Sequence, residues 1–150
     1  MKILDWQWNE KPIPYWTETC AFAKAHKVNR IALEMHPVAS TCELRGAIYH
    51  VHAKDTKIDK YNTAKNGVLD TKHYSDEYNR SWVFRTVGYG NGEAYWRDLV
   101  SNLRLCGYDR VLSIEHEDSF MTIDEGLRKA VDFLKDVIIY EEKPMTMSWA

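Results

Sequence analysis

The chain has 150 residues, of which 45% are hydrophobic and 28% charged, and its formal net charge is −2. This length and balance are typical of one globular domain, and the net charge argues neither for a nucleic-acid-binding surface nor for an acidic tail. No apolar run is long enough to cross a membrane, and Cys20, Cys42 and Cys106 are too widely spaced for a zinc finger or a disulfide framework, so we expect a single cytoplasmic domain over residues 1–150.

The first elements in chain order are a helix and two short strands. Pro14 to Lys27 is predicted to be helical, because proline suits a first helical turn and apolar residues recur there at helical spacing. Strands are expected over Ile31 to Met35 and over Ala47 to Ala53. A long loop follows over residues 54–92, and its many aromatic residues argue against disorder.

The second half of the chain alternates helix and strand. A helix is expected from Glu93 to Gly107, where glycine favours a left-handed cap. Its apolar stripe consists of Trp96, Leu99, Val100 and Leu103. A strand over Val111 to Glu115 follows, and Thr122 and Glu125 have the spacing of a capping box that opens the last helix. The stripe of that helix consists of Leu127, Ala130, Val131, Leu134, Val137 and Ile138. Residues 141–150 are expected to form an irregular tail.

This alternation predicts an α/β fold in which helices cover parallel strands. One connection does not fit a complete fold of that kind. A crossover between parallel strands needs about a dozen residues, usually with a helix, but only residues 37–46 separate the first two strands. Pro37 shortens any helix there further. Either these strands are not parallel neighbours or a strand–helix unit is missing between them, and we favour the missing unit.

Ionisable side chains gather at the carboxyl ends of the three predicted strands. Side chains on a strand alternate between its two faces. This parity groups Ala32, Glu34 and His36 on the first strand, Ile48, His50, His52 and Lys54 on the second, and Ser113, Glu115 and Glu117 on the third. In parallel α/β folds the carboxyl ends of the strands form the ligand-binding face. Two carboxylates and an imidazole at that face favour a divalent-metal site.

Each of these residues also has a purely structural explanation. Glu34 has the position of a strand-end carboxylate that water or Arg30 would satisfy, and Glu115 begins a charged run. A lone histidine such as His50 or His52 is more often a core residue than a ligand. The metal site is favoured because ionisable residues occur at the same structural point in all three strands.

The predicted loop contains a further candidate for ligand binding. Arg85 precedes a glycine-rich turn over residues 88–92, and its guanidinium suits a hydroxyl or phosphate oxygen of a ligand. The backbone amides of the turn, which leads into a helix, are a weaker candidate anion site. Glycines at such a place more often only make the turn.

Four stretches of the sequence resemble a known family. They are IALEMHP, IYHVHAKDT, NGVLDTKHYSDEYNRSWVFRTVGYGNG and GYDRVLSIEHED. Over residues 12–139 the chain resembles the carboxyl-terminal half of the sugar phosphate isomerase/epimerase family. These are xylose isomerase-like TIM barrels that also include inosose dehydratases, tagatose and psicose epimerases and, more distantly, endonuclease IV. The resemblance implies a partial TIM (β/α) barrel that lacks its amino-terminal half.

The resemblance also implies a metal site with a gap. In the family, Glu, Asp, His and Glu from four successive strands hold a divalent ion, and the matching residues here are Glu34, His52 and Glu115. The Asp strand has no counterpart, and its place in the order is the short connection over residues 37–46. The implied cofactor is Mn²⁺, Mg²⁺, Co²⁺ or Zn²⁺. The implied substrate contacts are His36, Lys54 and Arg85.

The family's chemistry is proton transfer on a sugar or polyol. Glu34 and Glu115 would remove and return a proton through an enediolate, which makes the chain resemble a metal-dependent sugar phosphate isomerase or epimerase. Because the Asp strand is missing, a second hypothesis is a non-catalytic half-barrel that self-associates as a homo-oligomer. A third is a metal-dependent phosphodiesterase similar to endonuclease IV, against which the absence of a basic surface counts.

Overall fold

The computed structural model describes residue 25 and residues 48–142. The chain divides into two units, residues 1–35 and residues 36–150, and the description below concerns residues 48–142 of the second unit. The helix predicted over Pro14 to Lys27 and the strand predicted over Ile31 to Met35 lie outside the described residues, apart from Ala25, which is helical. The prediction of a single domain therefore stays a prediction.

Two parallel strands form the centre of the described part. Strand β1 (Val51–Ala53) pairs in parallel with β4 (Leu112–Ile114), in a register that sets His52 beside Ser113. The prediction of parallel strands is thus confirmed for this pair. Each strand is shorter than expected, since the ladder covers three residues on each side. Within residues 48–142 the strands form two two-stranded sheets and no closed barrel.

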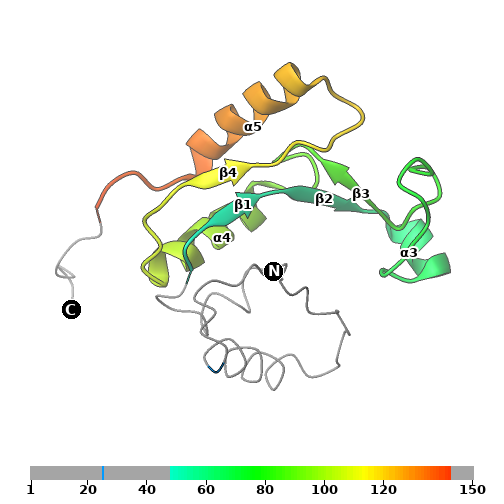
Figure 1. Cartoon of the computed structure of the whole chain (residues 1–150), viewed down its shortest axis with the longest axis horizontal. Coiled ribbons are helices and arrows are strands. Elements are labelled where there is room, and N and C mark those ends of the chain that lie inside the picture. The colour runs from blue at the N-terminus through cyan, green and yellow to red at the C-terminus, as the bar shows by residue number, and fades with distance from the viewer. Residues whose placement is uncertain (1–24, 26–47, 143–150) are drawn as a thin grey trace. The chain divides into compact units, whose positions relative to one another are not determined.

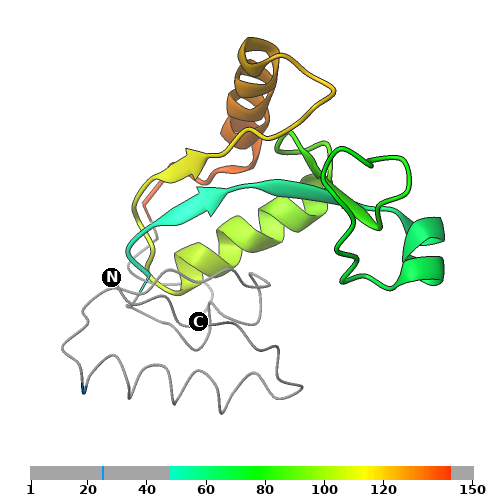
Figure 2. The same ribbon diagram turned by 45° about the vertical axis from the view of Figure 1, so that its right-hand side comes forward.

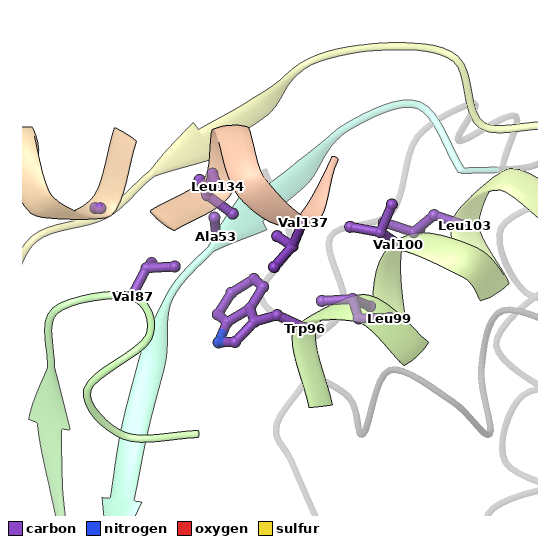
Figure 3. Close-up of a cluster of buried hydrophobic side chains, with 9 residues drawn as sticks. Ala53, Val87, Trp96, Leu99, Val100, Leu103, Leu134 and Val137 are labelled. Atoms are coloured by element: carbon purple, nitrogen blue, oxygen red, sulfur yellow. The ribbon is translucent and has the colours of Figure 1, made fainter. Parts of the chain in front are cut away.

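Two amphipathic helices cover one face of the β1–β4 pair. Helix α4 (Glu93–Leu105) and helix α5 (Ile123–Val137), which Figure 1 locates, contribute most of the core side chains drawn in Figure 3. Partly buried residues of β1 and β4 pack against this core. The buried core residues are Ala53, Val87, Trp96, Leu99, Val100, Leu103, Ala130, Leu134 and Val137. The mixed α/β fold expected from the sequence is therefore present, with a parallel pair and helices on one side.

The predicted ends of both helices are confirmed. After α4, Gly107 adopts φ +80°, and the Tyr108 backbone N–H donates to the Leu103 carbonyl, as a left-handed cap requires. Helix α5 begins after Thr122, whose hydroxyl accepts from the Glu125 N–H at 3.3 Å. The predicted stripe of α5 was only partly right, because Leu127 and Val131 are exposed while Ala130, Leu134 and Val137 are buried.

The loop predicted over residues 54–92 contains regular structure, and that prediction was wrong. Strand β2 (Asp55–Ile58) pairs antiparallel with β3 (Trp82–Arg85), and the short helix α3 (Lys60–Asn66) lies between them in sequence. Figures 1 and 2 show α3 at the end of the β2–β3 pair, away from α5. We call residues 55–85 the β2–β3 segment.

Buried polar residues hold the connection between α3 and β3. Asp70 accepts from the backbone N–H groups of Lys72 and Ser81, and the Lys72 ammonium lies 3.0 Å from its carboxylate. The guanidinium of the buried Arg80 lies over the rings of Tyr74 and Trp82, at 4.5 and 4.2 Å from their centroids. These charge-assisted and cation–π contacts add to the packing of Tyr74, Trp82 and Phe84 on one another, with ring centroids 5.3 to 5.9 Å apart.

No helix among the described residues is long and apolar enough to span a membrane. The longest of them is α5, with fifteen residues, and its apolar side chains alternate with Asp, Glu, Lys and Arg.

Candidate metal and substrate site

The face of β1 and β4 that is turned away from the helices carries the polar residues predicted from the sequence. The β1–β4 register sets His52 beside Ser113, while Ala53 and Ile114 pack into or against the core on the other side. Strand parity therefore assigns His50, His52, Lys54, Ser113, Glu115 and Glu117 to one face, as expected. The backbone N–H of Glu115 donates to the Ala53 carbonyl at 3.1 Å, so the ladder continues to the site.

Three ion-pair contacts connect the ends of the two strands. Nδ1 of His52 lies 2.6 Å from Oε1 of Glu115. Nζ of Lys54 lies 3.1 Å from Oε2 of Glu115 and 2.8 Å from Oε2 of Glu117. The two oxygens of Glu115 are thus occupied by different partners. The structure brings together three of the residues expected at the site, and it adds Glu117 to them.

One layer nearer the start of the strands, His50 and Ser113 form a separate pair. Nε2 of His50 lies 2.8 Å from the Ser113 hydroxyl, and the ring of His50 meets that of His52 edge to face at 4.9 Å. His50 therefore borders the cluster but has no contact with Glu115. The alternative in which both histidines are core residues is wrong, because both are exposed.

The charges in the cluster stabilise one another. The hydrogen bond from Lys54, followed by the charges of Lys54 and His52, lowers the pKa of Glu115 despite partial desolvation. Desolvation opposes the charge of Lys54, but its hydrogen bonds to Glu117 and Glu115 outweigh this and raise its pKa. Glu115 is thus a carboxylate and Lys54 an ammonium at neutral pH. The Lys54 ammonium also lies 4.3 Å from the centroid of the Phe84 ring.

The donor set suits a divalent cation. A carboxylate only accepts hydrogen bonds, so Nδ1 of His52 carries the proton in this arrangement and a neutral ring keeps its lone pair on Nε2. A cation held by both residues would take the place of this proton, between Nδ1 of His52 and Oε1 of Glu115. Among the described residues, no third His, Cys, Asp or Glu joins this pair to form a three-ligand group. Glu34 and His36, which were predicted to contribute, lie outside the described residues.

Arg85, the remaining predicted substrate contact, is not part of the cluster. The β2–β3 register pairs it with Asp55, on the other face from Lys54. Its guanidinium donates to the Phe84 carbonyl at 2.7 Å and lies 3.7 Å from Asp118 and 3.8 Å from the centroid of the Phe120 ring. These contacts are structural, and they connect β3 to the segment that follows β4.

The glycine-rich turn that was considered as an anion site binds a carboxylate of the same chain. Asp55 is only 1% exposed and accepts N–H groups of the turn and of neighbouring side chains. The donors are the backbone N–H groups of Thr56, Gly88, Gly90 and Asn91, the Asn91 side-chain amide and the Trp96 indole, at 2.7 to 3.3 Å. The sequence contains a signal for this contact, because Asp55 shares strand parity with the core-facing Val51 and Ala53.

Comparison with known proteins gives one relative of unassigned function. No family model matches the chain. The chain is 32% identical to the uncharacterized protein YfiH of Bacillus subtilis (strain 168), in a match that covers 91% of this chain and 55% of YfiH. The chain thus spans about half the length of the curated relative that it matches. The match runs over 173 aligned positions, whereas 91% of 150 residues is about 136, so about 37 positions have no counterpart in this chain.

Proposed function

We propose that this chain carries the site of a metal-dependent sugar or sugar phosphate isomerase or epimerase, on a partial barrel similar to the xylose isomerase-like TIM barrels. The observation that carries the proposal is the contact between His52 and Glu115 at the carboxyl ends of two parallel neighbours. In such folds this is the edge where ligands bind. The helix-covered face and the opposite polar face also fit a (β/α) barrel, in which helices surround the strands.

The number of unmatched positions in the match to YfiH is similar to the size of the missing unit inferred from the sequence. About 37 aligned positions without a counterpart correspond to the size of one strand and its helix. The connection over residues 37–46 is the place where the sequence is too short for a parallel crossover. The proposal therefore includes an internal deletion at this connection, with the loss of the Asp ligand that the family carries there.

In this proposal each residue of the cluster has a defined task. His52 and Glu115 would hold the divalent cation, which supplies charge stabilisation to neighbouring oxygens of the substrate when bound. The Glu115 carboxylate, whose two oxygens face His52 and Lys54, would accept the proton from carbon. Lys54 presents a positive charge beside it, and an ammonium there favours a substrate oxygen on which negative charge develops.

Two measurements on the full chain test the proposal. Titration with Mn²⁺ is expected to show one site per chain, which Glu115→Gln should abolish. Incubation with a panel of ketoses and their phosphates in D₂O is expected to give deuterium at the carbon next to the carbonyl, detected by proton NMR, and EDTA should stop the exchange. The absence of Mn²⁺ binding by the wild-type chain would refute the proposed metal site. Binding without exchange for any sugar of the panel would remove the catalytic claim.

A second candidate function is a non-catalytic half-barrel that self-associates. The observation that favours it is the exposed apolar row Ile123, Leu127 and Val131 on α5, together with strand edges of β1 and β4 that have no further partner among the described residues. Light scattering coupled to gel filtration tests this candidate, and a monomer at every concentration used would exclude it. The endonuclease-like alternative gains no support, because the net charge is −2.

A further inference from the structure

The ammonium of Lys54 is shared by two carboxylates that follow β4. It lies 3.1 Å from Glu115 and 2.8 Å from Glu117, whose side chains are 37% and 49% exposed. Glu115 and Glu117 are two residues apart and therefore project on the same face of the strand end. The Phe84 ring lies 4.3 Å from the same ammonium. Lys54 thus has two contacts besides the one with Glu115, to Glu117 and to the Phe84 ring.

Glu115 has competing partners in the proposed site. Its Oε1 faces His52 and its Oε2 faces Lys54. A divalent cation held by Glu115 and His52 would repel the ammonium, because like charges at short range destabilise one another. Without another anion, Lys54 would either leave the site or weaken the binding of the cation. Glu117 offers the ammonium a second anion at hydrogen-bonding distance.

We propose that Glu117 is a positioning residue that keeps Lys54 at the edge of the site and frees Glu115 for the divalent cation. This inference rests on the proposed function, since it takes His52 and Glu115 as ligands of that cation. Glu117 acts through Lys54 and does not itself contact the cation. Its effect on cation binding must therefore depend on the presence of Lys54.

A double-mutant cycle on the full chain tests this dependence. The Kd for Mn²⁺ is measured by calorimetry for the wild type, Glu117→Gln, Lys54→Met and the double variant. Glu117→Gln is expected to weaken binding roughly tenfold, in line with other partners of ligating side chains. Lys54→Met is expected to bind more tightly than the wild type. In the Lys54→Met background and in 0.15 M salt, Glu117→Gln should change the Kd by no more than about threefold, because screening reduces the roughly tenfold effect that one charge has on a divalent cation at about 6 Å in water.

Glu125→Gln is the matched control. Glu125 also pairs with a lysine, Lys129, at 2.7 Å and with similar exposure, but it lies on α5, which covers the opposite face of the sheet. This variant should leave the Kd unchanged, and circular dichroism should show that all variants remain folded. An equal tenfold loss with and without Lys54 would mean that Glu117 acts on the cation directly and would overturn the inference. An unchanged Kd in Glu117→Gln would also overturn the inference. A wild-type chain that binds no Mn²⁺ would remove the proposed function and this inference together.

Discussion

Glu115 contacts His52 at 2.6 Å, although the β1–β4 ladder pairs His52 with Ser113. The contacts of His50 with Ser113, of His52 with Glu115 and of Lys54 with Glu117 all join residues 63 apart, whereas the ladder joins residues 61 apart. The side chains therefore lean along the strands and meet one repeat of the pleat beyond their ladder partners. Because of this offset, the side chains at the ends of β1 and β4 carry their ionisable groups beyond the last pair of the ladder.

The two histidines should differ in their effect on cation binding. His52→Ala removes the imidazole that contacts Glu115 and is expected to weaken Mn²⁺ binding at least about tenfold. His50→Ala removes a neighbouring exposed imidazole that forms a hydrogen bond with Ser113 and meets the ring of His52 but does not contact Glu115, and is expected to change the Kd less than about twofold. Calorimetric titration of both variants measures the difference. Equal losses would show that the contact with Glu115 does not identify the ligand.

Asp55 should be among the most important residues for stability. Asp55→Asn replaces one accepting oxygen by an NH2 group that donates. This group would face the N–H donors of Gly88 or Trp96, which would then lack an acceptor. We expect the free energy of unfolding to fall by about 3 kcal/mol. Urea denaturation at pH 7 measures the change. Asp59→Asn is the control, because Asp59 is the exposed N-cap of α3 and asparagine caps equally well, which predicts a change below about 0.5 kcal/mol.

The glycine-rich turn should tolerate a methyl group at one position and not at another. A Cβ at Gly90 would overlap the Thr56 carbonyl and lie 2.7 Å from Oδ1 of Asp55. Gly90→Ala is therefore expected to cost about 2 kcal/mol or more. A Cβ at Gly92 would meet no atom within 4 Å, and Gly92→Ala should cost less than about 1 kcal/mol. Urea midpoints of the two variants compare the positions directly, and similar midpoints would contradict the tight approach at Gly90.

The β2–β3 segment should lose stability in acid through Asp70. Burial opposes its charge, but the N–H groups of Lys72 and Ser81 and the Lys72 ammonium lower its pKa from 3.8 to about 2. A carboxyl whose pKa is lower in the folded state stabilises the fold above its unfolded pKa, and this contribution is lost as the pH falls toward the folded pKa. Asp70→Asn should therefore be less stable than the wild type at pH 7, and the difference should shrink between pH 4 and pH 2. Urea midpoints at pH 7, 4 and 2.5 test this, and a constant difference would refute it.

The features that the sequence predicted correctly depend on local patterns. The stripe from Trp96 to Leu103 has helical spacing, and the cap at Thr122 needs only residues three positions apart, so both helices could be placed. The common face of His52, Lys54 and Glu115 follows from strand parity once the strands are recognised. The pairing of β1 with β4 then brings these residues together, as the α/β interpretation implied.

The features that the sequence did not reveal depend on tertiary contacts. The residues of β2, Asp55 to Ile58, lack an apolar alternation, so nothing local marked them as a strand that β3 would pair with. The burial of Asp55 depends on the turn at residues 88–91, whose backbone N–H groups surround its carboxylate. The apolar stripe of a helix does not show which of its residues pack against another element. For this reason Leu127 and Val131, which are exposed, were expected in the core.

The β2–β3 segment is closed at its base by two connections. The Asp59 backbone N–H donates to the Ser81 carbonyl at 2.9 Å. Asp55, next to Lys54, accepts hydrogen bonds from the backbone N–H groups of Gly88 and Asn91, which follow β3. Residues 60–80 therefore leave and re-enter the fold at one point, the Ile58–Trp82 end of the β2–β3 ladder, which is the end farther from Lys54. Gly67 is exposed and lies within residues 60–80. A fluorescent reporter protein inserted after Gly67 would therefore lie outside the closed ends of this segment and leave His52 and Glu115 in place.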